Sequence, residues 1–230
     1  MQKICKTAIF DFQEKDQDLI DELSKFLDEN AKIALDFFEI EMPKDKVQIN
    51  IIPSKEEFDN VFKSSRSLSK DYQVPSWLRG TCRDGVITYL SIHGYNGTTH
   101  AFDEKDYEKA IEDYKKTILH EYVHFINENF NKQKNCSYTE RYLVEGIATY
   151  LSGQKEGQNL QLTASKEKIL NPRNYYYNDY YLLTKYLVEN YDKPFVLELF
   201  QSSRMARDFL TNELYDKAQG HSNKTPENSI

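Results

Sequence analysis

The chain has 230 residues, enough for one domain or for two small lobes with a hydrophobic core that needs no disulfide bonds. Acidic side chains outnumber basic ones by 37 to 30, and the net charge of −7 argues against a nucleic-acid partner, because phosphate groups attract basic surfaces. Apolar residues form no run of the roughly 18 or more that a membrane helix needs, so no membrane span or membrane partner is expected.

The cysteines and the first residues bear on the cellular compartment. Cys5, Cys82 and Cys136 are far apart and form no CxxC pair, so we expect no disulfide framework. The opening segment MQKICKTAIFDF has only a short apolar patch before Asp11 and lacks the hydrophobic core of a signal peptide. We therefore expect a cytoplasmic protein, although a secreted chain that had lost its leader would have the same pattern.

The first half of the sequence alternates strand and helix patterns. Val47, Ile49 and Ile51 alternate with polar residues, as in a half-buried strand. Ser54 and Glu57 have the spacing of a capping box, which predicts a helix directly after that strand. In chain order we expect a strand over 3–12, a helix over 16–39, a strand over 47–52, the capped helix, a loop over 64–84 and a strand over 86–91.

The second half is mainly helical in pattern. We expect helices over 103–131, 138–152 and 175–191, and one or two more between 194 and 217. Ser137 and Glu140 have capping-box spacing at the start of the second of these helices. The chain is therefore expected to be an α+β protein with an α/β lobe over 1–102, a helical lobe over 103–218 and a disordered tail over 219–230, together forming one catalytic unit.

The segment TILHEYVHFINENF contains the strongest chemical signal. His120 and His124 are four residues apart, so a helix places both imidazoles on one face, where one zinc ion can bind them. Glu121 lies about 100° further round the helix, where it can take a proton from a zinc-bound water without binding the metal itself. The flanking residues are mostly apolar, as in a buried helix, which disfavours the alternative of two histidines on an exposed helix.

A catalytic zinc ion needs a third protein ligand and one open position. Glu145 lies in the segment RYLVEGIATYL, whose other residues are mostly apolar. A buried carboxylate without a partner is costly, and a metal ion would compensate its charge. We therefore expect His120, His124 and Glu145 to bind one zinc ion per chain.

The segments HEYVH and LVEGIATYL together resemble the HExxH and downstream E-G-x-A-x-Y-L sequences of the gluzincins, zinc metallopeptidases that include thermolysin-like and aminopeptidase-like enzymes. The resemblance covers roughly residues 46–205. It is closest to small peptidase-MA-like domains, in which a W-x-x-G sequence precedes the zinc helix, as WLRG does here at 77–80. It implies a zincin-like fold: a small mixed sheet with an edge substrate strand, packed on the active-site helix and followed by a mainly helical lobe.

The resemblance also implies a substrate-binding strand. The segment 86–91 resembles the edge strand to which gluzincins add an extended peptide. On this basis the residues expected to bind substrate are Val86, Ile87, Thr88 and Tyr89.

A tyrosine is implied as the donor of a hydrogen bond to the oxyanion. The segment YYYNDYYLLTKYL resembles the helix whose first tyrosine has this role in the aminopeptidase branch. The alignment assigns the role to Tyr177, with Tyr176 and Tyr180 as alternatives, because Tyr180 stands where the family has glycine.

These features predict a zinc-dependent metallopeptidase that hydrolyses a peptide or protein substrate, with Glu121 activating a zinc-bound water. Two alternatives stay open: a non-catalytic zinc-containing protein that binds peptides, and a zinc hydrolase of a non-peptide acyl substrate. The sequence does not distinguish aminopeptidase from endopeptidase activity, and it is silent on the oligomeric state.

Overall fold

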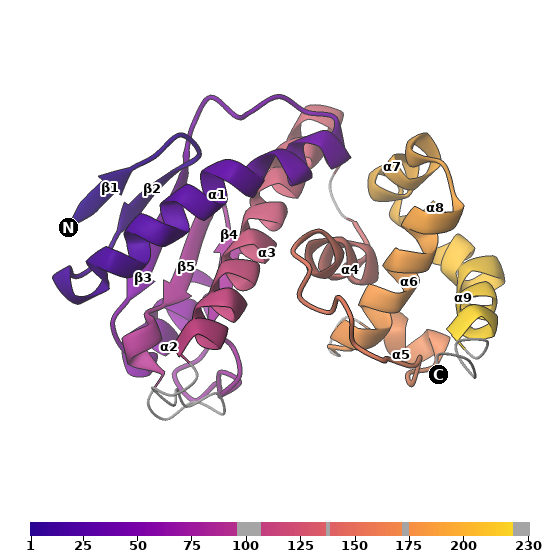
Figure 1. The fold of residues 1–230 in the computed structure, drawn as a ribbon. Coiled ribbons are helices and arrows are strands. Elements are labelled where there is room, and N and C mark those ends of the chain that lie inside the picture. The colour runs from indigo at the N-terminus through magenta and orange to yellow at the C-terminus, as the bar shows by residue number, and fades with distance from the viewer. Residues whose placement is uncertain (96–106, 137–138, 172–174, 223–230) are drawn as a thin grey trace, which may run out of the picture. The chain divides into compact units, whose positions relative to one another are not determined.

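The computed structural model describes residues 1–95, 107–136, 139–171 and 175–222. They form two compact units, Met1–Glu128 and Asn129–Ile230 (Figure 1). The boundary lies later than the predicted one at 102 because the helix that carries His120 packs on the sheet of the first unit. In that helix the ring of Tyr114 lies 4.3 Å from the ring of Tyr89, and its hydroxyl donates a hydrogen bond to the carbonyl of Leu90 at 3.1 Å.

The first unit contains a mixed five-stranded sheet, which confirms the expected α+β class. Its strands are β1 (Gln2–Ile4), β2 (Ala8–Asp11), β3 (Val47–Ile52), β4 (Gly80–Arg83) and β5 (Val86–Leu90), in the order β1-β2-β3-β5-β4. The pairs β2–β3 and β3–β5 are parallel, whereas β1–β2 and β4–β5 are antiparallel.

The strand expected over 3–12 is in fact two strands joined by a turn. The turn is held by the carboxylate of Asp28, which accepts hydrogen bonds from the backbone N–H groups of Lys6 and Thr7 at 3.0 and 2.9 Å. Asp28 comes from a distant helix, so the sequence near the turn gave no sign of this break.

The strand expected at the edge of the sheet lies inside it. β5 pairs with β3 on one side and with β4 on the other, so that Ile87 lies opposite both Ile49 and Cys82. Because both sides of its backbone are already paired, Val86, Ile87, Thr88 and Tyr89 cannot receive an added strand. The edge-strand prediction for these residues is wrong, and the edge strands of the sheet within the described residues are β1 and β4.

A local signal for β4 was present in the sequence. Asp84 and Gly85 connect β4 to β5 and have φ angles of 52° and 79°, as the central residues of a two-residue hairpin turn require. The backbone N–H of Gly85 also donates a hydrogen bond to the carboxylate of Glu128 at 3.0 Å. An Asp-Gly pair before an apolar strand therefore marked a hairpin within the segment expected to be a loop.

Three helices accompany the sheet, α1 (Gln17–Phe38), α2 (Lys55–Ser65) and α3 (Tyr107–Lys134). The expected cap of α2 is confirmed, because the Ser54 side chain accepts a hydrogen bond from the N–H of Glu57. Lys115 of α3 forms an ion pair with Glu22 of α1 at 2.6 Å, so these two helices are neighbours (Figure 1). α2 packs on β3 and β5.

The second unit is helical. Its helices are α4 (Arg141–Leu151), α5 (Lys166–Leu170), α6 (Tyr177–Asn190), α7 (Lys193–Gln201), α8 (Ser203–Phe209) and α9 (Tyr215–Ser222), with a π-helical turn over Leu210–Leu214. α9 includes residues 219–222, which were expected to be disordered, and the rest of the predicted tail lies outside the described residues.

The expected capping box at the start of α4 is not formed as predicted. Ser137 lies outside the described residues, and Glu140 is the N-cap residue of α4, so it does not stand inside the first turn. Its carboxylate is bound by other groups: it accepts a hydrogen bond from the hydroxyl of Ser203 at 2.6 Å and pairs with Arg207 at 3.3 Å.

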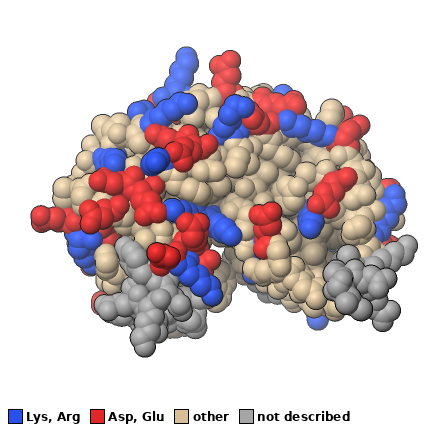
Figure 2. Space-filling view, in the orientation of Figure 1, with Lys and Arg blue, Asp and Glu red and all other residues tan. Residues whose placement is uncertain are grey.

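Charged side chains of both signs are intermingled on the face drawn in Figure 2, and the described residues there form no continuous basic patch. Among the described helices, none is long and apolar enough to cross a membrane.

Candidate metal centre

His120 and His124 lie on the same face of α3, as their spacing predicts. Their Nε2 atoms are 3.0 Å apart, and the two rings meet edge to face with centroids 4.7 Å apart. In a tetrahedral site with Zn–N bonds of about 2.0–2.1 Å, two nitrogen ligands lie roughly 3.3 Å apart. The two imidazoles therefore have nearly the separation that one metal ion requires.

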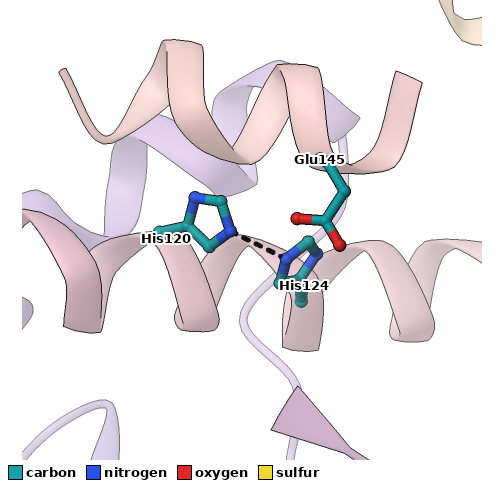
Figure 3. Close-up of side chains that lie close together, drawn as sticks. All are labelled: His120, His124 and Glu145. Atoms are coloured by element: carbon teal, nitrogen blue, oxygen red, sulfur yellow. Dashed lines mark hydrogen bonds between the residues drawn. The ribbon is translucent and has the colours of Figure 1, made fainter. Parts of the chain in front are cut away.

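Glu145 of α4 completes a group of three metal-ligand side chains. One ligand atom from each of His120, His124 and Glu145 lies within 4.8 Å of the other two. The Glu145 carboxylate points toward the imidazole of His124 (Figure 3). Two imidazole nitrogens and one carboxylate oxygen match the ligand set of a catalytic zinc site, so these residues could hold a metal ion.

Glu121 lies against the start of β4. It is only 7% exposed, and a Cβ atom built on Gly80 would lie 3.1 Å from its Oε1 atom. The same Cβ atom would lie 2.6 Å from the ring of Tyr89. A glycine at position 80 therefore lets the sheet edge approach this carboxylate, which explains the last residue of WLRG in physical terms.

The scan against family models found no match, and neither a curated protein nor a solved structure is significantly similar to this chain. The likeness to gluzincins therefore rests on the quoted sequence segments alone.

The helix that carries Glu145 is held closely against α6. A Cβ atom on Gly146 would lie 2.0 Å from Oγ1 of Thr184 and 2.6 Å from the carbonyl oxygen of Tyr180. The hydroxyl of Thr149 donates a hydrogen bond to the carbonyl of Glu145 at 2.7 Å. The glycine after Glu145 thus allows the two helices to meet, and the contacts of α4 fix the backbone at Glu145.

The three candidate tyrosines lie together at the start of α6. Tyr176 is its N-cap residue, and Tyr177 is half-buried, with its ring 6.3 Å from that of Tyr180. Tyr180 is fully buried, and burial raises the pKa of its phenol. The charge of Arg141 lowers that pKa and the charge of Glu145 raises it. All three tyrosines stay candidates for the oxyanion donor.

Proposed function

We propose that this protein is a zinc-dependent metallopeptidase in which His120, His124 and Glu145 hold the zinc ion. The observation that carries the proposal is the grouping of these side chains with Glu121 next to the first of them. Three protein ligands leave a tetrahedral ion one open position, as in catalytic zinc sites. Zinc is favoured over magnesium and calcium because those ions prefer sites made of oxygen ligands.

When bound, zinc supplies Lewis acidity, which polarises a carbonyl group and lowers the pKa of water. Glu121 takes a proton from the attacking water and transfers it to the leaving amine. Its burial and its contact with the start of β4 restrict the positions that its carboxylate can adopt. A phenol from Tyr177, or from Tyr176 or Tyr180, donates a hydrogen bond to the developing oxyanion.

An extended substrate would add to β4 instead of β5. β4 has a partner strand on one side only within the described residues, and it begins at Gly80, beside Glu121. A peptide that pairs with such an edge takes its main-chain hydrogen bonds from the sheet. This placement would bring a peptide bond close to the general base.

Metal content measured by mass spectrometry tests the metal site. We expect one zinc ion per chain in the wild type and in His93→Ala, a control that removes an exposed histidine, and little zinc in Glu145→Ala. A ligand that binds only the folded chain stabilises it, so a chelator should lower the melting temperature of the wild type but not of Glu145→Ala. The absence of zinc from metal-replete wild type would refute the site.

Cleavage of a peptide library tests the chemistry. Glu121→Gln should keep its zinc and lose about 10²- to 10⁴-fold in kcat/KM, the usual contribution of a general base. Full activity of that variant would show that another group activates the water. Peptides that bind to the zinc-loaded protein but are never cut would favour a non-catalytic role, and cleavage of esters but not peptides would favour another acyl substrate.

A further inference from the structure

Arg79, directly before Gly80, is a half-buried cation. Its carbonyl accepts a hydrogen bond from the N–H of Leu90 at 2.7 Å, which extends the β4–β5 pairing by one residue. In the part of the chain that the structure describes, no carboxylate lies within ion-pair distance of its guanidinium, whereas Arg83 and Arg207 each have such a partner.

The Arg79 guanidinium lies over an aromatic ring. Its central carbon lies 5.5 Å from the ring centroid of Tyr95, and Tyr95 and Tyr89 are both buried. Burial works against the charge of Arg79, but the neighbouring Tyr89, Tyr95 and Asp113 side chains raise its pKa. A guanidinium is protonated at neutral pH in any case. A cation partly withdrawn from water forms stronger charge-assisted hydrogen bonds than a fully solvated one.

The residue that follows Arg79 lies between Tyr89 and the proposed general base. The ring of Tyr89 lies against Gly80, at the point where Gly80 faces the carboxylate of Glu121. Burial raises the pKa of the Tyr89 phenol, and the charges of Arg79 and Glu121 both act on it. Arg79 therefore directly precedes the residue at which the sheet edge meets Tyr89 and Glu121.

We propose that Arg79 determines specificity by binding a carboxylate group of the substrate, an inference that rests on the proposed peptidase function. A planar guanidinium can donate two parallel hydrogen bonds to one carboxylate. The protein carries a net charge of −7, so an acidic substrate needs a local cation to offset the repulsion. The carboxylate can be an acidic side chain or the C-terminus of a peptide, and the two sources are separated by experiment.

The test uses matched peptides built around a site that the wild type cleaves. For each position near the cleaved bond, one pair of peptides differs only by Glu or Gln at that position. A further pair differs only by a C-terminal acid or a C-terminal amide. We expect one carboxylate to raise kcat/KM by about 10- to 100-fold, the usual effect of a hydrogen bond to a charged group. The pair that shows the difference identifies the source of the carboxylate.

Variants of Arg79 show whether this residue causes the preference for acidic over neutral peptides. In Arg79→Gln the ratio between the acidic and neutral peptides should fall to near one, and Arg79→Lys should restore part of it. Arg204→Gln, which removes a cation that is 93% exposed and lies outside β4, should leave the ratio unchanged. A ratio in Arg79→Gln equal to that of the wild type would overturn the inference.

These experiments distinguish a failure of the proposed role of Arg79 from a failure of the peptidase proposal. Equal cleavage of acidic and neutral peptides by the wild type would overturn the role of Arg79 but leave the peptidase proposal intact, and this comparison needs no variant to fold. Failure to cleave any peptide would overturn the peptidase proposal. Calorimetric titration with N-acetylglutamyl amide and N-acetylglutaminyl amide would then decide whether Arg79 binds carboxylates, and equal affinities in wild type and Arg79→Gln would refute it.

Discussion

Replacing Gly80 with alanine tests whether β4 must approach Glu121 as closely as the structure shows. The added methyl group would lie 2.6 and 2.7 Å from two ring carbons of Tyr89 and 3.1 Å from Oε1 of Glu121. Tyr89 has little room to move, because it is fully buried and its ring centroid is 4.3 Å from that of Tyr114. The strand, the ring or the Glu121 carboxylate must therefore shift.

The expected change in the free energy of unfolding is the difference between a destabilising and a stabilising contribution. Contacts of 2.6–2.7 Å are about 1 Å shorter than the optimal carbon–carbon separation. Overpacking of this kind costs about 1–3 kcal/mol, whereas exchanging glycine for alanine recovers about 0.4–1 kcal/mol by restricting the unfolded chain. We expect a net destabilisation of about 1–2 kcal/mol, which lowers the melting temperature of a chain of this size by roughly 2–8 °C.

Thermal and urea unfolding followed by circular dichroism would measure this change. Gly220→Ala is the matched control, because a Cβ atom there meets nothing within 4 Å and the residue lies in α9. It should be neutral or stabilising by up to about 1 kcal/mol. Under the proposed function, Gly80→Ala should also keep its zinc and lose about 10- to 100-fold in kcat/KM, because a small displacement of a catalytic group is costly.

Unchanged stability of Gly80→Ala would refute the close packing at this position. If Gly80→Ala and Gly220→Ala had the same melting temperature, β4 would not lie as close to Tyr89 and Glu121 as described. If Gly80→Ala were less stable but fully active, the close contact would be real and the positioning of Glu121 would not depend on it.

Three further changes probe other parts of the fold. Gly146→Ala should destabilise the second unit by at least about 2 kcal/mol in urea unfolding, because the new Cβ atom would lie 2.0 Å from Oγ1 of Thr184. Arg207→Ala should cost about 1–2 kcal/mol by the same measurement, because it leaves the carboxylate of Glu140, which is 3% exposed, without its cation. The pKa of Asp28 is lowered on folding, because burial, which acts to raise it, is outweighed by hydrogen bonds at the β1–β2 turn. The contribution of Asp28 to stability is therefore fully present above its ordinary pKa of 3.8 and is lost as the pH falls through its pKa in the folded protein. Asp28→Asn should therefore lose less stability than the wild type when the pH is lowered through this range.

Each of these three predictions has a control variant or a result that would contradict it. Arg204→Ala removes a side chain that is 93% exposed and whose ion pair with Asp208 is long, at 3.8 Å. It should therefore change the stability by less than about 0.5 kcal/mol. Equal effects of Arg204→Ala and Arg207→Ala would contradict the role of the Glu140 pair. Thr184→Ala should partly rescue Gly146→Ala by removing the nearer contact, and no rescue would point to another cause. Identical acid unfolding of wild type and Asp28→Asn would contradict the assignment at the turn.

Patterns with a short range were predictable from the sequence. Alternating apolar residues predicted β3 at its observed bounds, and the helical period predicted α1 and the long helix α3 to within a few residues. The cap at Ser54 was predicted because its partner, Glu57, lies three residues away in the chain. The short helix α5 and the strand β4 were missed, because only a few residues carry each pattern.

The sequence alone determined that His120 and His124 share one face of a helix with Glu121 at its rim, because the period of a single helix sets their relation. Only the tertiary structure decided that β5 lies inside the sheet, that Gly80, at the start of β4, lies near Glu121 and Tyr89, and that Arg79 lies over the ring of Tyr95. Strand order depends on hydrogen bonds between segments that are distant in the chain, and periodicity within one segment carries no information about its partners. The same limit applies to Glu145, whose distance from the histidines depends on how separate helices are placed.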